Sequence, residues 1–561
     1  MNSLWKKGLA VLSTAALATA VLAGCGGGST GNTGNAPTST PSGDTGTPQK
    51  GGKIDIDIND DLAHLDPAVA YDQGDWEFLP QQLYNQLLTY KPGTAELQPD
   101  LATSMPDISK DGLTYTFHLR KGVKFANGDP VTAQCFVDEF KRILTKSLQS
   151  PAVGFIDPAI QGADDFYNGK TKELTGVVAK DDYTLVIKLT KPATYFTKIL
   201  AMPFFSPVDE KYIQSIGGDK AFDHKPMGTG PFMMKSYDFG KEMVLVRNPN
   251  YFDKDKKPYL DEIDVHINSN PSATALSFEQ GNTAFMSDFT QDIPAQSFLK
   301  WSNDPQYQSL IKKQPLMGVY YLGLNTQVAP FNNKLVRQAI EYAINKDNLV
   351  KLNNGRAQVT NEILPPGIEG YTKTLHGKDD VNYKYDPQKA KELLKQAGVS
   401  NLTVNMVVRN RSPLTECAQS IQADLKAVGI TVNLQQVGES DYLSKAESGK
   451  AQMGLYGWFA DFPDPYDFLD VLFNSAQAPI NNWANYKNPE VDKELAQAAT
   501  MPDGPERYAL YDKIQDQILD DAAWVPLYNP VATTIHQSWV HNFYTNPVLE
   551  DPLADIWVSK H

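Results

Sequence analysis

The chain has 561 residues, a formal net charge of −15, 41% hydrophobic and 21% charged residues, and three cysteines. Its length predicts roughly two to four domains with hydrophobic cores, and its composition excludes a wholly disordered protein. Three cysteines are too few for a disulfide-stapled scaffold. The acidic balance argues against nucleic acid as the main partner, because phosphate binding needs clustered lysine and arginine side chains.

The amino terminus has the pattern of a cleavable export signal. Two lysines precede an uncharged run from Gly8 to Gly24 that is rich in Ala, Leu and Val. The run is shorter than the about 20 apolar residues of a membrane-spanning helix, and it ends in small residues. Its last residues, Leu22-Ala23-Gly24-Cys25, resemble the bacterial lipoprotein box, which implies a signal peptide over residues 1–24 and a lipid on Cys25. The alternative is an ordinary signal peptide followed by an incidental cysteine.

The next segment, residues 26–50, is predicted to be a flexible tether. It is Gly, Ser, Thr, Asn or Pro at 21 of 25 positions, a composition that cannot bury apolar surface. Residues 25–50 together, with a lipid on Cys25, would hold the rest of the chain outside the cytoplasm and roughly 25–30 Å from a membrane. No later segment of the sequence is long and apolar enough to span a membrane.

Apolar residues that alternate with polar ones predict strands in the body of the chain. The predicted strands cover residues 54–58, 113–119, 183–189, 263–267, 402–408 and 431–437. A helical stretch that ends near Gly429 lies between the last two strands, so they form a β-α-β unit and the fold class is α/β. The Asn168-Gly169 dipeptide predicts a tight hairpin turn.

Helices become frequent after about residue 320. Asp386-Pro387 supplies an N-cap and a first-turn proline for one helix, and Gly398 supplies its end. Asn488-Pro489 opens a second helix in the same way. Apolar residues recur every four positions from Leu510 to Ile518 and predict the buried face of a third helix.

Sequence motifs of catalysis are absent, so an enzyme is not expected. There is no HExxH or GxSxG pattern and the eight histidines are scattered, so neither a metal site nor a cofactor is expected. Pairs of carboxylates are too common among 66 acidic residues to identify or to exclude a glycosidase. Cys135 and Cys417 are expected to be free, buried thiols, although the sequence does not exclude that they pair.

Six segments of the body have distinctive motifs. They are YTFHLRKGVKFANGDPVTAQCFVDEF at Tyr115–Phe140, GTGPF at Gly228–Phe232, RNPNYF at Arg247–Phe252, PFNNKLVRQAIEYAINKD at Pro330–Asp347, YDPQKAKELLKQAG at Tyr385–Gly398 and GWFADFPDPYDFL at Gly457–Leu469. Together and in this order, they resemble the extracytoplasmic solute-binding proteins of peptide-type ABC importers (family 5), and the oligopeptide-binding members most closely.

The resemblance implies a bilobed α/β fold of the periplasmic-binding-protein type with an extra inserted domain, in which two lobes close over a ligand by a hinge motion. The first lobe is expected to be discontinuous in sequence. The expected ranges are 51–95, 210–310 and 528–561 for lobe I, 96–209 for the inserted domain and 311–527 for lobe II.

The same resemblance implies a ligand site around Asp461. In oligopeptide-binding relatives, an aspartate in this Gly-Trp-x-x-Asp block pairs with the free α-amino group of the ligand, and a carboxylate in a partly dry cleft suits an ammonium. Residues 453–459 are expected to form an edge strand whose backbone pairs with an extended peptide. Gly457 allows close backbone approach, while Trp458 and Phe459 either wall pockets or pack in the core. The alternative role of Asp461 is to cap the turn that follows it.

The opposite wall of the cleft is expected from the loop Gly74-Asp75-Trp76, with burial of Trp76 under the loop as the alternative. Some oligopeptide-binding relatives have a cation six positions before the anchoring aspartate, where this chain has Leu455. As in dipeptide-binding relatives, Arg411 is the expected partner of the ligand carboxylate, and an ordinary surface arginine is the alternative. Arg409 lies in the same loop, and longer peptides are favoured if neither arginine engages that carboxylate.

The resemblance therefore implies an extracytoplasmic binding subunit, anchored to the bacterial membrane through Cys25, that captures short peptides and passes them to ABC permease subunits. It is expected to be a monomer that binds no nucleic acid. Two alternatives remain open. One is a family member tuned to a nickel chelate, haem, an oligosaccharide or an opine, and the other is a surface-anchored hydrolase that uses a carboxylate pair.

Overall fold

The computed structural model describes residues 47–59, 61–71, 80–157, 159–255, 257–288, 291–371, 383–548 and 553–560. The predicted signal peptide, Cys25 and nearly all of the predicted tether lie outside these residues, and so does the predicted ligand loop Gly74-Asp75-Trp76. The described chain is a mixed α/β structure, as the sequence predicts.

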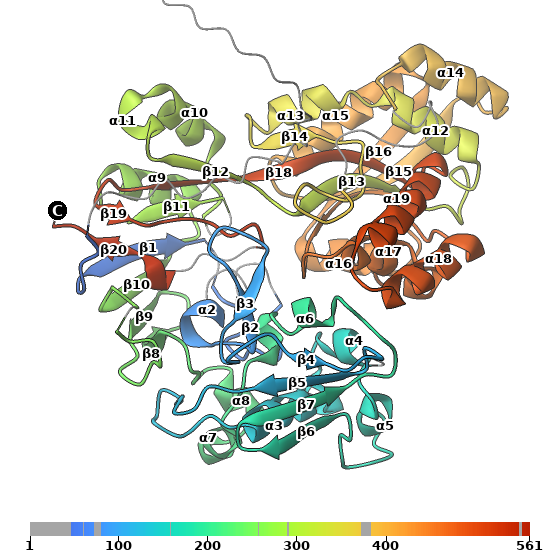
Figure 1. Ribbon diagram of the computed structural model, residues 1–561. Helices are drawn as coiled ribbons and strands as arrows, with labels where there is room; N and C mark the ends of the chain where they lie inside the picture. The colour runs from blue at the N-terminus through green and yellow to red at the C-terminus, as the bar shows by residue number, and fades with distance from the viewer. Residues whose placement is uncertain are drawn as a thin grey trace, which may run out of the picture. The chain divides into compact units, whose positions relative to one another are not determined.

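Two four-stranded sheets are built from residues before position 270 (Figure 1). The first has the order β1 (Lys53–Ile58), β10 (Glu262–Ile267), β9 (Glu242–Arg247) and β8 (Phe232–Asp238). Its β1 and β10 run parallel, and its other pairs are antiparallel. The second sheet is antiparallel and has the order β4 (Asp107–Ile108), β5 (Thr114–His118), β7 (Thr184–Lys188) and β6 (Val177–Asp181). The helix α3 (Ala133–Ile143) packs on β6 and β7.

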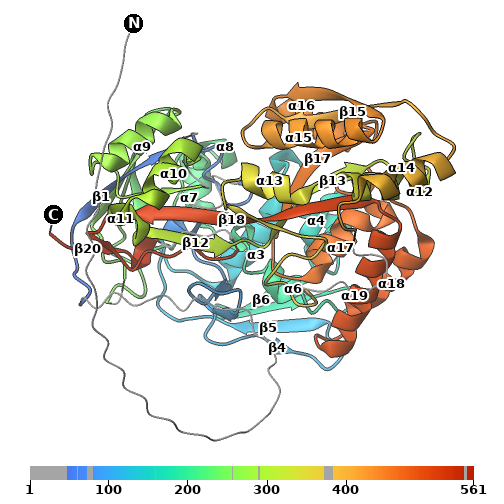
Figure 2. The same ribbon diagram turned by 90° about the horizontal axis from the view of Figure 1, so that it is seen from above.

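The largest sheet has eight strands and is organised around one long strand, β18 (Trp524–His536). The sheet order is β11 (Phe285–Ser287), β18, β13 (Gly318–Leu324), β17 (Met453–Phe459), β15 (Leu402–Arg409) and β16 (Ile430–Val437), and β12 (Ile311–Pro315) and β14 (Ala357–Val359) also pair with β18. The amino-terminal part of β18 pairs with β13, and its carboxyl-terminal part pairs with β12 and β11. Both views show β18 as a red strand that runs from the elements around β12 to those around β13 (Figures 1 and 2).

Helices and two short strand pairs complete the described chain. The strand pairs are β2 (Leu88–Tyr90) with β3 (Leu97–Pro99) and β19 (Val540–His541) with β20 (Trp557–Val558). The remaining α-helices are α2 (Pro80–Leu83), α4 (Val153–Ile156), α5 (Ala163–Tyr167), α6 (Phe196–Ile199), α7 (Glu210–Ile216), α8 (Asp219–Phe222), α9 (Pro271–Glu279), α10 (Ala295–Asn303), α11 (Pro305–Gln308), α12 (Lys334–Ala343), α13 (Lys346–Leu352), α14 (Pro387–Gln396), α15 (Leu414–Ala427), α16 (Glu439–Glu447), α17 (Pro465–Phe473), α18 (Pro489–Thr500) and α19 (Pro505–Asp520). The described chain also has short 3-10 helices at Lys146–Leu148, Pro203–Phe205, Ser475–Gln477 and Leu553–Asp555.

Two large clusters of buried apolar side chains form the core. One packs α12 and α15 on the sheet around β15, with Ile340, Ile421 and Val404 among its members. The other runs continuously from β1 through the β4–β7 sheet to α17 and α19, and it includes Phe117 and Phe468. Within this cluster, Tyr195 just before α6 stacks on Tyr466 of α17, so these two regions are in direct contact.

Most of the predicted elements are confirmed, because their signals are local. Each predicted strand coincides with a strand of the structure within one or two residues, and β15, α15 and β16 form the predicted parallel β-α-β unit. The Asp386 carboxylate caps α14 by accepting from the backbone N–H groups of Gln388 and Lys389 at 3.0 and 2.9 Å. The Asn488 side chain caps α18 in the same manner.

The predicted hairpin at Asn168-Gly169 is wrong. Asn168 is the C-cap of the short helix α5, and Gly169 has a φ of 69°. A left-handed residue after a helix needs the same conformational freedom as a tight hairpin turn, so the dipeptide alone does not distinguish the two.

The strand β17 forms where the sequence predicts it, but only part of it is an edge. Its whole length pairs with β13. On its other side, the described strand β15 pairs with Met453 and Gly454, and the Tyr442 hydroxyl donates to the Leu455 carbonyl at 3.1 Å. Residues 456–459 therefore have one side outside the ladders of the described strands. The edge prediction is wrong for the first residues because the β-α-β unit places β15 beside them.

The two cysteines of the described chain are free, as predicted, and Cys417 is buried, but the predicted burial is wrong for Cys135, which is half-buried. Among the helices that the structure describes, none is long and apolar enough to cross a membrane. The three predicted domain ranges stay predictions, and the boundary expected at residues 527 and 528 falls inside the continuous strand β18.

Candidate functional site

Asp461 lies two residues after the end of β17, where three parts of the chain meet. Its backbone N–H donates to the carboxylate of Asp467 at 2.9 Å. Its own carboxylate accepts from the Tyr71 hydroxyl, at 2.9 Å for Oδ2 and 3.1 Å for Oδ1. The preceding residue, Ala460, donates to the carbonyl of Met317 at 2.8 Å. The loop is thereby held in place while one polar partner of Asp461 comes from a segment 390 residues earlier.

Burial perturbs the ionisation of this carboxyl group. It raises the pKa of Asp461 to about 7, although the hydrogen bond from Tyr71 acts in the opposite direction. Burial also raises the pKa of Asp467 well above its usual range, and the charge of Asp461 adds to that effect. A carboxylate in such surroundings gains strongly from a cationic partner, because the desolvation penalty on its charged form is then offset.

A cavity of about 660 Å³ lies beside the free edge of β17. Three of the predicted ligand residues, Gly457, Phe459 and Arg411, line it. Trp458 faces the other side of the strand, where its indole N–H donates to Asp467 at 3.3 Å and its ring packs against the core. Because side chains alternate along a strand, Phe459 faces the cavity and Trp458 faces the core beside the Asp461 loop.

The floor of the cavity is aromatic. Tyr320 makes an edge-to-face contact with Phe459 at 5.8 Å and stacks on Tyr528 at 4.9 Å between ring centroids. A Cβ atom placed on Gly457 would lie 2.8 Å from the Tyr320 ring. Only glycine therefore lets the backbone of β17 lie this close to the ring.

Three arginines line the same cavity, and each is paired with a carboxylate. Arg411 forms an ion pair with Asp292. Arg409 pairs with Glu439 at 2.6 Å, and Arg356 pairs with Asp288 at 2.7 Å. A ligand carboxylate that binds Arg411 would share this guanidinium with Asp292.

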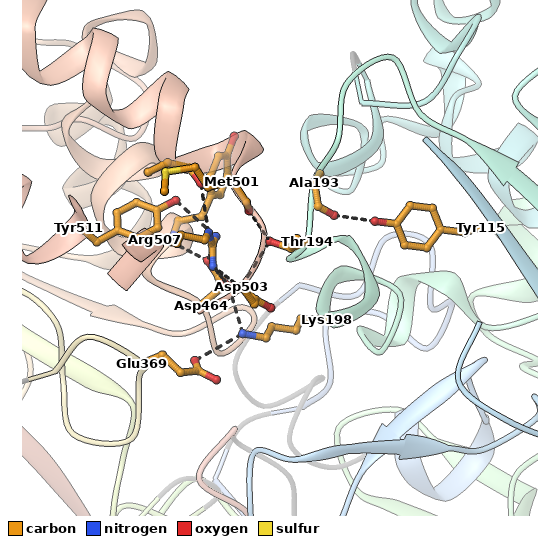
Figure 3. A network of polar contacts seen from close by, with 12 residues as sticks. Tyr115, Ala193, Thr194, Lys198, Glu369, Asp464, Met501, Asp503, Arg507 and Tyr511 are labelled. Carbon is orange, nitrogen blue, oxygen red and sulfur yellow. Dashed lines mark hydrogen bonds and ion pairs between the residues drawn. The ribbon is translucent and has the colours of Figure 1, made fainter. Parts of the chain in front are cut away.

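Sequence reasoning missed the groups that support Asp461. Tyr71 ends the described segment just before the predicted Gly74-Asp75-Trp76 loop, and nothing in its local sequence marks it. Asp464 was detectable, because Asp464-Pro465 has the same N-cap pattern as Asp386-Pro387, and its carboxylate does cap α17 at 3.0 Å from the Tyr466 N–H. Figure 3 shows that Asp464 also belongs to a polar network with Arg507 and Lys198.

Within the part of the chain that the structure describes, no group of three or more His, Cys, Asp or Glu side chains is arranged to hold a metal ion. The cavity beside β17 is lined by no histidine of the described chain.

Comparison with known proteins identifies the family. The family model of the bacterial extracellular solute-binding proteins, family 5, matches residues 96–480. Heme-binding protein A of Haemophilus influenzae is 31% identical over 88% of this chain and 90% of that protein. The periplasmic oligopeptide-binding protein OppA of Salmonella typhimurium is 30% identical over 81% of this chain and 82% of that protein. These relatives are solute-binding proteins rather than enzymes.

Solved structures agree. The periplasmic binding protein DppA of Helicobacter pylori in complex with the peptide STSA is 31% identical, with a TM-score of 0.77 over 91% of this chain and 99% of that chain. HbpA2 of Haemophilus parasuis is 26% identical, with a TM-score of 0.74 over 91% of this chain and 100% of that chain. The fold is the bilobed α/β fold of these proteins, as the sequence predicts. The chain therefore belongs to the bacterial extracellular solute-binding proteins of family 5.

Proposed function

We infer that this protein is a lipid-anchored extracytoplasmic binding subunit that captures short peptides with a free amino terminus and delivers them to the permease of an ABC importer. The observation that supports this most is the position of Asp461, a half-buried carboxylate of raised pKa at the end of the free edge of β17. An ammonium group is the partner that best compensates such a charge.

The edge of β17 supports recognition of an extended main chain. Residues 456–459 offer backbone groups on a side that no described strand pairs with, and Gly457 lets the Tyr320 ring of the cavity floor lie close to this backbone. Recognition through the main chain tolerates many side chains, and the adjoining cavity of about 660 Å³ has room for them.

The pairing of Arg411 with Asp292 bears on peptide length. Because this guanidinium already has a carboxylate partner, the carboxyl terminus of the ligand has no dedicated, unpaired cation among the arginines that line the cavity. Peptides whose carboxyl end lies beyond Arg411 are therefore favoured over dipeptides.

The anchor and the delivery step rest on the sequence and the family. Leu22-Ala23-Gly24-Cys25 is the lipoprotein pattern, and the family consists of extracellular solute-binding proteins. Metabolic labelling with a radioactive fatty acid should label the full chain in bacterial cells, and Cys25→Ala should abolish the label and release the protein from membranes. Labelling of the Cys25→Ala variant at the level of the full chain would refute the anchor.

A second ligand, haem, is favoured by one observation: a relative that is 31% identical is named as a heme-binding protein. Mass spectrometry of the intact protein under non-denaturing conditions separates the two proposals. Co-purified peptides give a ladder of small added masses, whereas haem gives a single added mass. Haem would also give the purified protein visible absorbance.

Titration calorimetry with tri- to pentapeptides tests the peptide proposal directly. We expect binding to the purified chain, and loss of binding both when the peptide α-amine is acetylated and when Asp461 is changed to Asn. Asp441→Asn, which alters an exposed aspartate on α16, is the matched control and should bind like the wild type. Undiminished affinity for the acetylated peptide would rule out Asp461 as the amine anchor.

A further inference from the structure

A short segment outside β17 and its cavity contacts the loop that bears Asp461. This segment, Thr194–Lys198, begins just before α6 and is anchored on the β4–β7 sheet. The Tyr115 hydroxyl on β5 donates to the Ala193 carbonyl at 2.9 Å, and the Tyr115 ring meets Phe196 edge-to-face at 5.5 Å. These contacts fix the position of the segment on the β4–β7 sheet.

Lys198 makes the main polar contact. Its ammonium donates to Asp464 Oδ2 at 3.0 Å and to Glu369 Oε2 at 3.4 Å (Figure 3). The side chain of Asp464 is 0% exposed and that of Lys198 is 11% exposed, so water hardly screens this ion pair. Despite burial, Lys198 and Arg507 hold the pKa of Asp464 below its usual range, so the pair stays charged at neutral pH.

Aromatic and hydroxyl contacts lie beside the ion pair. The Tyr195 ring stacks on Tyr466 at 4.1 Å between centroids and lies parallel to Phe462 at 6.0 Å. The Thr194 hydroxyl donates to the Met501 carbonyl at 3.3 Å. The segment thus contacts both the turn that runs from Asp461 to Tyr466, through Tyr195, and the chain after α18, through Thr194.

The chemistry of the contact suits repeated opening. Arg507 binds both oxygens of Asp464, through Nη1 to Oδ2 at 3.0 Å and through Nη2 to Oδ1 at 2.7 Å. If Lys198 moves away, Asp464 keeps a full cationic partner and Lys198 becomes hydrated. Breaking a buried ion pair usually costs much because it leaves an unpaired buried charge. Here neither separated surface is left with such a charge.

The contact also lies next to the ligand site. Asp464 is three residues after Asp461, and the intervening turn is closed by the Asp464 N–H, which donates to the Phe462 carbonyl at 2.8 Å. Tyr71 reaches the same turn from a different part of the chain. Movement of the β4–β7 sheet relative to α17 would therefore break the Lys198 contact at the moment that the surroundings of Asp461 open.

We propose that Thr194–Lys198 is a closure latch: it docks on Asp464 and Tyr466 when the protein closes, and thereby slows ligand release without touching the ligand. The inference rests on the proposed ligand site at Asp461. It gives a binding role to the region around α6, with Lys198 as a positioning residue for that site.

Stopped-flow or surface-plasmon measurements on Lys198→Met test the latch with a peptide that the wild type binds. We expect the dissociation rate to rise about fivefold to tenfold, with the association rate within about twofold of wild type. Lys198→Arg keeps the charge and the donors and should restore slow release. The matched control is Lys110→Met, which removes an exposed lysine from the loop between β4 and β5.

Hydrogen exchange of the unliganded protein provides a readout that needs no peptide. In Lys198→Met and in Tyr195→Ala, the backbone amides of residues 461–466 should exchange faster than in Lys110→Met, by a larger factor than the change in the free energy of global unfolding explains. Dissociation rates and exchange rates equal to those of the control would overturn the latch. If the wild-type protein binds no peptide, the proposed function fails, and the exchange measurement still decides whether Lys198 holds this loop.

Discussion

The Tyr71 hydroxyl donates to both oxygens of the Asp461 carboxylate, at 2.9 Å to Oδ2 and at 3.1 Å to Oδ1. The Tyr71 ring lies against Phe204, 5.7 Å between centroids, so the phenol is held by its ring as well as by its hydroxyl. A neutral donor stabilises the carboxylate less than a cation does. A ligand ammonium would therefore bind this carboxylate more strongly than the phenol does.

The affinity for peptides should depend on pH through Asp461. Burial raises the pKa of this group to about 7, and an ammonium binds only its ionised form. Affinity should therefore fall as the pH drops below about 7, approaching about tenfold per pH unit. Because Asp467 has a raised pKa as well, the observed midpoint belongs to the pair of carboxyl groups.

Titration calorimetry between pH 5.5 and 8.5, in buffers of different ionisation enthalpy, measures this effect and should show proton release on binding at pH 7. The stability of the unliganded protein should depend on pH in the opposite direction from the affinity. The folded state binds the Asp461 proton more tightly than the unfolded state does. The contribution of Asp461 to the free energy of unfolding therefore falls as the pH rises from about 4 to about 7. An affinity that stays constant over the whole range would contradict the assignment.

Tyr71→Phe should move the pH profile of binding to higher pH. The hydroxyl lowers the pKa of Asp461, so its removal raises that pKa, while the phenylalanine ring keeps the contact with Phe204. We expect affinity at pH 7 to fall by about twofold to fivefold and the difference to vanish by pH 8.5. Tyr212→Phe, which removes a hydroxyl that donates to the Lys225 carbonyl, controls for the loss of a phenol elsewhere.

Gly457→Ala should weaken peptide binding and destabilise the protein modestly. The new methyl group would lie 2.8 Å from the Tyr320 ring, so the ring must move from its stack on Tyr528. Overpacking of this kind costs about 1–3 kcal/mol, measurable by urea unfolding. Gly438→Ala is the control, since its φ is −69° and a Cβ there meets nothing within 4 Å; it should change stability by less than about 0.5 kcal/mol. Equal binding by both variants would show that the Tyr320 stack does not shape the site.

Arg507→Met should destabilise the folded protein strongly. Arg507 is fully buried and holds both oxygens of the fully buried Asp464. Removal leaves Lys198 as the remaining cation at that carboxylate, and breaking a buried pair typically costs about 3–5 kcal/mol. Asp503→Asn removes a partner of Arg507 that is 42% exposed and should cost less than about 1 kcal/mol in the same urea titration. Similar losses for the two variants would mean that burial of Asp464 does not set the cost.

Local signals in the sequence predicted most of the elements correctly. The caps at Asp386 and Asn488 and the alternation in β1, β5 and β7 depend on neighbours within a few residues, so they can be recognised without the fold. The Asn168-Gly169 dipeptide failed because two local structures share its conformational requirement. The motif order was sufficient to identify the family, whose model covers residues 96–480.

The sequence by itself determined the secondary structure, the family and the position of Asp461 after a strand. Only the tertiary structure decided what surrounds that carboxylate. Tyr71 is 390 residues from Asp461 and Lys198 is 266 residues from Asp464, and the side of β17 that stays free depends on where β15 pairs. Such contacts follow from the packing of whole elements, which no local pattern specifies, and the raised pKa of Asp461 follows from the burial that this packing produces.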